Sequence, residues 1–207
     1  NTVHYQHPKV DGYDISFNRI NKELKSLQNN LNELNIPISL HMGSEVFFLP
    51  NLNIIKDDPI TTMGNKKYML IEFMPNYIPD IHRKTLFDLK MNGITPLIAH
   101  PERYKPVQND INLVFEWLNA GCLIQVDAGS IIGTLGQNSK DAAEIIVKQN
   151  WCQILGSDAH NNKVRNFCLG PAYDEIKNLF GKAADVITKL GAEDKAKIKE
   201  YEGYVNN

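Results

Sequence analysis

Short apolar runs alternate with longer amphipathic stretches along most of this sequence, and this alternation restricts the fold more than any other feature. A first predicted strand ends near His4. Further apolar runs predicted to be strands lie at about residues 38–48, 67–73, 95–100, 122–127 and 152–157. Helical periodicity occupies about residues 20–34, 79–92, 109–120 and 139–149, and most of the chain from Pro171. Nearly continuous apolar strands separated by helices are typical of a parallel sheet covered on both faces. The sequence therefore predicts an α/β fold.

Two glycine-containing segments are predicted to interrupt this regular pattern. The run at 38–48 is expected to enter a Gly43–Ser44 turn at Glu45. The segment from Gly129 to Gly136 is expected to be a loop over the end of the sheet. It has no lysine at the place that a phosphate-binding loop requires, and no dinucleotide-binding glycine pattern is present.

Composition limits the class of protein and its partners. The 207 residues suit a single domain, and a hydrophobic content of 43% is ordinary for a globular protein with a full core. The net charge of −2, without a basic stripe, gives no support for binding to nucleic acid or to an anionic membrane. No apolar run approaches the ~20 residues of a membrane-spanning helix. The distant cysteines Cys122, Cys152 and Cys168 indicate reduced thiols, and we expect a cytoplasmic location.

Acids and histidines stand where the predicted strands end. They are His4, Glu45, Glu72, His100, Asp158 and His160. Carboxyl ends of parallel strands share one edge of the sheet, where sites in α/β folds form. Asp158 and His160 are two residues apart and would point the same way while a strand lasts. Imidazole and carboxylate ligands of this kind hold zinc, manganese or iron.

Each of these residues also has a purely structural explanation, such as a helix cap, a turn or a paired carboxylate. A buried ionised carboxylate is costly unless it is paired or bound to metal, so a shared metal site accounts for the whole set more simply. The other histidines, His7, His41 and His82, fall in loop, mid-strand and helix positions and are expected to be structural or exposed. His7 is the least certain of these because it lies close to His4.

Two arginines lie a few residues after strand-end histidines, and they suggest a phosphorylated substrate. Arg103 comes three residues after His100, and Arg165 comes five residues after His160. One guanidinium group can donate two parallel hydrogen bonds to two oxygens of a phosphate. Arginines beside a predicted metal site therefore favour hydrolysis of a phosphoester by metal-activated water. A surface salt bridge is the alternative for each arginine. No cysteine is followed by five residues and then an arginine, the pattern that thiolate phosphatases require.

Four motifs in this order resemble a known family. They are Gly43-Ser-Glu45, Leu70-Ile-Glu-Phe73, Ile98-Ala-His-Pro-Glu-Arg-Tyr104, and Gly156-Ser-Asp-Ala-His160 with Arg165. They resemble the bacterial metal-dependent protein-tyrosine phosphatases of the polymerase-and-histidinol-phosphatase (PHP) superfamily, which are associated with capsule and exopolysaccharide synthesis. The resemblance implies a distorted (β/α)7 barrel of the TIM-like PHP type. It also implies phosphotyrosine as substrate, notably in the tail of a bacterial tyrosine autokinase.

The resemblance also implies roles for single residues around a di- or trinuclear divalent cluster, with manganese expected first and iron or zinc as alternatives. Glu45 would bridge two metals, and Glu72 and His100 would complete the ligands of the second. Asp158 would bind the first metal, and His4 and His160 the third. Arg103 and Arg165 would hold the phosphate and stabilise developing charge.

The sequence departs from the family pattern at its start. The family begins with a strand that carries Asp-x-His-x-His, and this N-terminal stretch of about 35–40 residues, with the first strand and helix, is not in the 207 residues. We therefore expect one PHP domain over residues 1–207 that lacks this first unit. Two other functions stay open: a PHP phosphoesterase that acts on a small metabolite such as histidinol phosphate, and a metal-poor relative that binds phosphotyrosine without hydrolysis. The sequence leaves the oligomeric state open.

Overall fold

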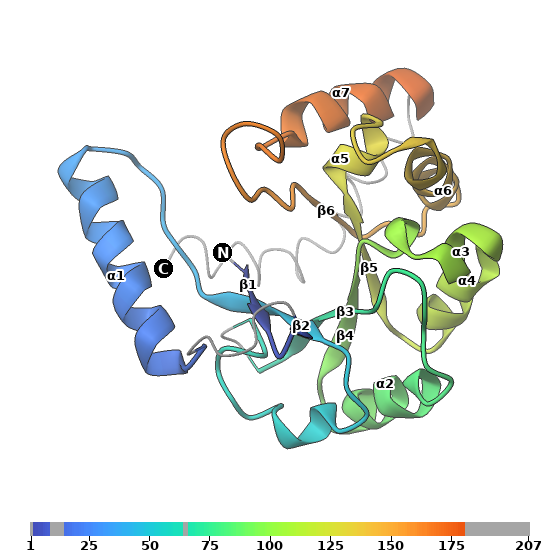
Figure 1. Cartoon of the computed structure of the whole chain (residues 1–207), viewed down its shortest axis with the longest axis horizontal. Helices are drawn as coiled ribbons and strands as arrows, with labels where there is room; N and C mark the ends of the chain where they lie inside the picture. The colour runs from blue at the N-terminus through green and yellow to red at the C-terminus, as the bar shows by residue number, and fades with distance from the viewer. Residues whose placement is uncertain (1, 9–14, 64–65, 181–207) are drawn as a thin grey trace.

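The computed structural model describes residues 2–8, 15–63 and 66–180, which form one curled parallel sheet with helices around it (Figure 1). The strands are β1 (Thr2–Tyr5), β2 (Gly43–Phe47), β3 (Tyr68–Glu72), β4 (Thr95–Ala99), β5 (Leu123–Asp127) and β6 (Ile154–Gly156). The helices are α1 (Phe17–Glu33), α2 (His82–Met91), α3 (Lys105–Asn109), α4 (Asn112–Asn119), α5 (Ala128–Ile131), α6 (Gln137–Lys148) and α7 (Leu169–Phe180).

The strands lie in the sheet in the order in which they occur in the chain, β1-β2-β3-β4-β5-β6, and every neighbouring pair is parallel. The carboxyl ends of all of them therefore face the same edge. The register places His4 opposite Glu45, and Phe47 opposite Glu72. This confirms the predicted α/β fold with a parallel sheet, in the form of a half-barrel.

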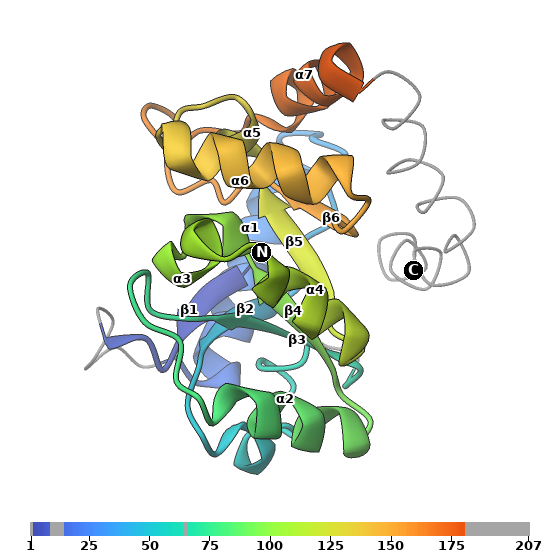
Figure 2. The same ribbon diagram turned by 90° about the vertical axis from the view of Figure 1, so that its right-hand side faces the viewer.

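One face of the sheet packs on α2, α4 and α6, which cover it in Figure 2. Val46, Ile71, Ile98 and Ile124 point to this face and are fully buried. Fully burying such a side chain contributes about 1.5–3 kcal/mol. Side chains alternate along a strand, so the residues next to these four in sequence, such as Glu45 and Glu72, point to the opposite, inner face of the sheet. This alternation puts the acids of β2 and β3 on the inner side.

The predicted Gly43–Ser44 turn is wrong, because both residues belong to β2, which begins only at Gly43. The Ser44 hydroxyl donates to the carbonyl of Ile60 at 2.8 Å, so this small polar side chain is satisfied inside the core. His41 consequently precedes the strand and does not lie within it. Residues 38–42 are not strand, although they continue the apolar run.

Two further elements differ from the prediction. The helix expected at about 109–120 is α4, which begins only at Asn112, and a short additional helix, α3, precedes it. Asp110 between the two helices has extended backbone. The loop expected after Asp127 begins with the short helix α5. The Asp127 carboxylate caps that helix by accepting from the Gly129 N–H at 2.7 Å, and a side-chain cap of this kind is typical of aspartate at a helix start.

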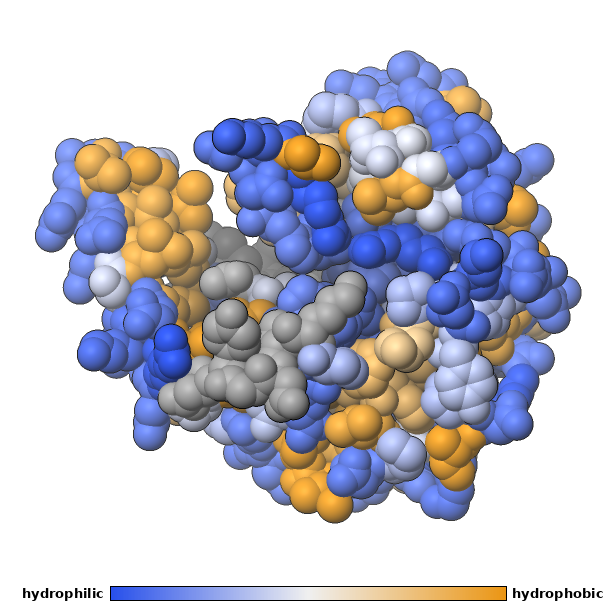
Figure 3. Space-filling model, viewed as in Figure 1, coloured by the Kyte–Doolittle hydropathy of each residue, from blue (hydrophilic) through white to orange (hydrophobic). Residues whose placement is uncertain are grey.

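Helix α1 stands away from the rest of the described chain (Figure 1). The predicted amphipathic helix is confirmed, but none of its residues is buried. Figure 3 shows apolar side chains gathered on one side of α1. Among the residues that the structure describes, no helix has both the length and the apolar character needed to cross a membrane.

Candidate metal centre

Four of the predicted ligands meet near the carboxyl ends of β1 to β4, with Glu45 between the others. Glu72 is the last residue of β3 and His100 follows β4 directly, whereas His4 and Glu45 lie within β1 and β2. The His100 Nε2 lies 2.8 Å from Glu45 Oε1 and 3.7 Å from Glu72 Oε1. The His4 Nε2 lies 3.6 Å from Glu45 Oε2 and 4.0 Å from Glu72 Oε2. The structure thus brings together residues near four different strand ends.

Tyr104 holds the ends of the two strands that carry Glu72 and His100. Its buried hydroxyl donates to the Ala99 carbonyl at 2.7 Å and accepts from the Phe73 N–H at 3.0 Å. These two residues directly flank His100 and Glu72 in sequence. His100 itself has a left-handed backbone, with φ of 33°, immediately before Pro101. Such a conformation is uncommon outside glycine and is retained where the surrounding structure enforces it.

Glu45 and Glu72 are both largely buried, but their pKa values are shifted in opposite directions. Burial disfavours the charge of Glu45, but the hydrogen bond and charge of His100 outweigh it and lower the pKa of Glu45. Burial also opposes the imidazolium of His100, yet Glu45 raises the pKa of His100. At Glu72, burial and then the nearby charge of Glu45 raise the pKa. Two acids side by side in this setting favour a bound cation.

The remaining predicted residues form a second group after β6. The Arg103 Nη1 donates to Asp158 Oδ2 at 2.7 Å, and the Arg165 Nη2 pairs with the same oxygen. The His160 Nδ1 donates to the Asp158 carbonyl at 2.8 Å, and the His160 and His4 rings lie 5.8 Å apart. The charge of Asp158 also contributes to the raised pKa of Glu72. The two groups are therefore neighbours at one edge of the sheet.

The expected alternation of Asp158 and His160 along a strand is wrong. Strand β6 ends at Gly156, and Asp158 has a left-handed backbone with φ of 42°. The two side chains approach each other through the turn, with His160 Nδ1 3.6 Å from Asp158 Oδ1. The short sequence spacing, without the strand, keeps them close.

Two residues at the site were missed by the sequence analysis. His7, expected to be structural or exposed, lies at the site: its Nε2 is 3.6 Å from Glu72 Oε2, and its ring is 5.2 Å from that of His4. Asp127 is buried, and its Oδ2 accepts from the Arg103 Nη1 at 3.4 Å. Asp127 closes β5 as Glu72 closes β3, and this signal was sufficient to find it.

The donor set fits a divalent cation. One ligand atom from each of His4, Glu45 and Glu72 lies within 4.8 Å of the others. Glu72 Oε2 is buried without a hydrogen bond, which leaves an anionic oxygen directed into the cluster. A cavity of about 250 Å³ adjoins the cluster and is lined by Glu72, Pro75, His100, Arg103, Tyr104, Leu135 and Ser139. Carboxylate and imidazole ligands beside an arginine-lined cavity suit metal-assisted chemistry on an anion.

Several known proteins are similar to this chain in sequence. CapC of Staphylococcus aureus is 30% identical over 177 residues, which cover 85% of this chain and 68% of CapC. YwqE of Bacillus subtilis, named a tyrosine-protein phosphatase, is 31% identical over 134 residues, covering 65% of this chain and 53% of YwqE. The tyrosine-protein phosphatase CpsB of Streptococcus agalactiae serotype V is 35% identical over 147 residues, covering 68% of this chain and 60% of CpsB.

A solved structure agrees with these sequence relatives. It comes from crystal structures of YwqE from Bacillus subtilis and CpsB from Streptococcus pneumoniae, which are described as metal-dependent tyrosine phosphatases. The TM-score is 0.80 at 26% identity, covering 86% of this chain and 73% of the solved one. The family described as "Capsular polysaccharide synthesis, CpsB/CapC" matches residues 1–198. The chain therefore belongs to the CpsB/CapC family of capsular polysaccharide synthesis.

Proposed function

We propose that the protein hydrolyses phosphotyrosine in proteins in a metal-dependent reaction. The observation that carries the proposal is the Glu45–His100 pair, with Glu72 and His4 around it and two arginines on the adjacent Asp158. The relatives named tyrosine-protein phosphatases support the same chemistry. Manganese, iron or zinc would each suit this donor set.

The metal roles follow the residue-by-residue resemblance. Glu45 would bridge two cations, Glu72 and His100 would bind one of them, and Asp158 would bind the other. His4 and His160 would hold a third cation; their rings already lie 5.8 Å apart. Bound divalent cations supply Lewis acidity and a hydroxide nucleophile at neutral pH. His7, beside Glu72, is in position to orient that carboxylate.

The arginines give the site its preference for phosphate. Arg103 and Arg165 both pair with Asp158 in this structure. When Asp158 serves as a metal ligand, its charge is shared with the cation and the guanidinium groups can bind phosphate oxygens. Bidentate contacts of arginine suit the spread of charge on a transferring phosphoryl group.

The expected partner is the phosphorylated tail of a bacterial tyrosine autokinase that controls polysaccharide synthesis. We also propose that the complete fold is a distorted (β/α)7 barrel of the PHP type. The parallel strands, which lie in the sheet in their order along the chain, support this proposal. The single domain over residues 1–207, the cytoplasmic location and the nuclearity of the cluster stay predictions.

Phosphate release from a phosphotyrosine peptide tests the proposal. We expect turnover by the protein loaded with Mn²⁺, loss of turnover on exhaustive chelation, and recovery when Mn²⁺ returns. Glu45→Gln should abolish turnover, whereas Glu116→Gln, on the exposed surface of α4, should not. Faster hydrolysis of histidinol phosphate than of the peptide would favour a metabolite phosphatase. Tight peptide binding without phosphate release would favour a phosphotyrosine-binding protein.

A further inference from the structure

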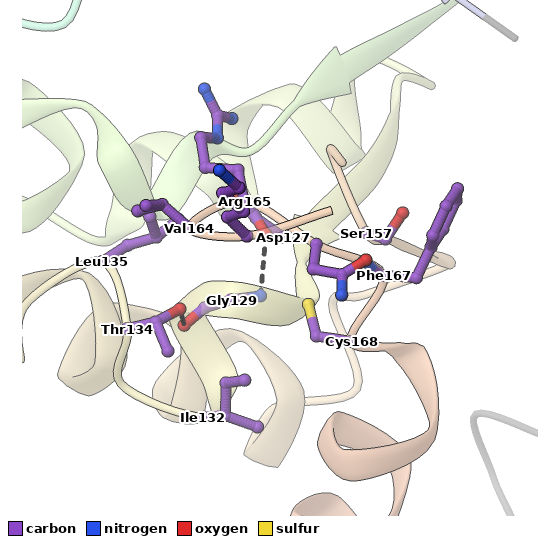
Figure 4. Close-up of a pocket in the computed structure, with 12 residues that line it drawn as sticks. Asp127, Gly129, Ile132, Thr134, Leu135, Ser157, Val164, Arg165, Phe167 and Cys168 are labelled. Atoms are coloured by element: carbon purple, nitrogen blue, oxygen red, sulfur yellow. Dashed lines mark hydrogen bonds between the residues drawn. The ribbon is translucent and has the colours of Figure 1, made fainter. Parts of the chain in front are cut away.

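A second cavity opens beside the metal centre, between the segment that follows β5 and the segment that follows β6 (Figure 4). Its volume is about 200 Å³. The lining residues are Asp127, Gly129, Ile132, Thr134, Leu135, Ser157, Lys163, Val164, Arg165, Asn166, Phe167 and Cys168. Pockets for drug-sized molecules usually measure about 300–1,000 Å³, so this cavity suits one side chain better than a cofactor.

The character of the cavity changes from one side to the other. In Figure 4, Asp127 and Arg165 lie on one side, and Ile132 lies on the opposite side. Leu135 and Val164 add further apolar surface to the lining. Val164 is 88% exposed, although an apolar side chain of this size is usually buried. Leu135 also lines the cavity that adjoins the metal cluster, whereas Ile132 and Val164 are absent from that lining.

The polar side of the cavity connects it directly to the proposed phosphate-binding residues. Arg165 lines the cavity and also pairs with Asp158 through Nη2. Asp127 lines the cavity and accepts from Arg103. Because Arg165 belongs both to the cavity lining and to the proposed phosphate site, a polypeptide whose phosphotyrosine contacts these arginines passes near this opening.

Hydrogen bonds to backbone groups, most of them made by side chains, hold both walls in place before any ligand binds. The Asn161 side chain accepts from the N–H groups of Lys163 and Val164, each at 2.9 Å, and the His160 N–H donates to the Arg165 carbonyl at 2.8 Å. On the other wall, the Thr134 hydroxyl donates to the Gly129 carbonyl at 3.0 Å. A wall formed in advance lowers the ordering cost of binding.

We propose that this cavity binds an apolar side chain of the substrate polypeptide, one or two residues from the phosphotyrosine. The inference rests on the proposed function and adds a sequence preference to it. The metal centre and arginines recognise the phosphate group, and the cavity selects among phosphotyrosine sites by their neighbours.

A series of phosphotyrosine peptides tests this preference. Each peptide carries a single leucine at position −2, −1, +1 or +2 in an otherwise serine background, and p-nitrophenyl phosphate serves as a substrate without neighbours. We expect leucine at one position to lower KM about fivefold or more relative to serine, which corresponds to about 1 kcal/mol of binding free energy. Equal KM values for every peptide would overturn the inference.

Substitutions then connect the preference to the cavity. Val164→Ser should reduce the leucine preference to less than about twofold, because it removes apolar surface from the wall. Ile54→Ser, at a residue that is 77% exposed and outside the cavity lining, is the matched control and should keep the full preference. An unchanged preference in Val164→Ser would contradict the inference. A parallel rise in KM for p-nitrophenyl phosphate would also contradict it, since the cavity would then hold the phenol ring.

Alkylation of Cys168 supplies a readout that does not need turnover. Cys168 lines the cavity and is partly exposed, whereas Cys122 and Cys152 are buried. A leucine peptide with a non-hydrolysable phosphotyrosine mimic should slow N-ethylmaleimide addition to Cys168, measured by intact mass, more than the serine peptide does. Equal protection by both peptides would contradict the inference. A protein that hydrolyses no phosphopeptide but shows leucine-dependent protection would contradict the proposed function alone.

Discussion

The two halves of the candidate centre differ in how firmly the protein holds them. Glu45 and His100 are 6% and 2% exposed and are hydrogen-bonded to each other. Tyr104 joins the ends of the neighbouring strands β3 and β4. Asp158 and His160 lie on a turn past β6, and the His160 side chain is 37% exposed. One half is a buried wall of the sheet, and the other is a turn whose acid is paired with arginines.

This difference indicates what metal binding must change. In the buried half, the ligand atoms already face one another, so a cation would replace the Glu45–His100 hydrogen bond with little movement. In the turn, both arginines pair with Asp158 Oδ2, so a cation bound to Asp158 would share the carboxylate charge with them and weaken both pairings. We infer that the sheet provides affinity for metal, whereas the turn couples metal binding to the release of arginines for phosphate.

The largest expected effect compares one histidine from each half. His100→Ala should lower kcat by about 10³-fold or more, the scale for a group that acts with others as a unit. It should also destabilise the fold, because Glu45 would be left buried without its partner. His160→Ala should retain more bound metal and cause no comparable loss of stability. Metal content by elemental analysis and thermal unfolding check this, and equal losses in both variants would break the comparison.

The next effect concerns Arg103, which contacts acids from β5 and from the turn. Arg103→Ala should lower kcat by about 10²–10³-fold, the range for removing one donor to developing charge, while bound metal stays at the wild-type level. Arg83→Ala, which removes an exposed guanidinium paired with Glu116, should have no such effect. Loss of metal in proportion to activity would show that Arg103 supports the ligands instead.

A smaller effect is expected at Asp127, the buried acid that holds Arg103 from β5. Asp127→Asn keeps an oxygen for the Gly129 cap but removes the charge that orients Arg103. We expect kcat to fall by about 10-fold, the lower end for changes around a metal site, with metal content unchanged. Asp110→Asn is the matched control, since Asp110 also accepts from a backbone N–H, that of Asn112, and does not contact Arg103. A similar fall in both variants would argue against the role of Asp127.

The smallest expected effect is on the pH dependence of folding stability, at the buried His82, which packs against Phe73 at the end of β3. Burial lowers the pKa of His82, whose Nδ1 donates to the Pro79 carbonyl at 2.7 Å. Below the ordinary value of 6.5, the unfolded chain binds more protons at this residue than the folded one, so folding stability falls as the pH falls. Denaturant titrations from pH 7 to 5 should show a steeper loss for the wild type than for His82→Gln. Identical slopes would contradict a buried neutral His82.

Much of the centre was predictable because parallel strands direct their carboxyl ends to one edge. His4, Glu45, Glu72 and His100 follow from that rule alone. His7 could not be found in this way, since it lies in a loop after β1 that has no periodicity. The shared pairing of both arginines with Asp158 depends on long flexible side chains whose positions local sequence does not specify. The sequence also could not show that no residue of α1 is fully buried, because an amphipathic pattern indicates a helix but not what it packs against.

An anomalous difference map from crystals grown with Mn²⁺ tests the central claim most directly. The account predicts manganese at the Glu45 carboxylate, with Glu72 and His100 bonded to one ion and Asp158 to the other, and with Asp158 no longer shared by both arginines. Manganese bound elsewhere in an active protein, with Glu45, Glu72 and His100 still in contact only with one another, would contradict it.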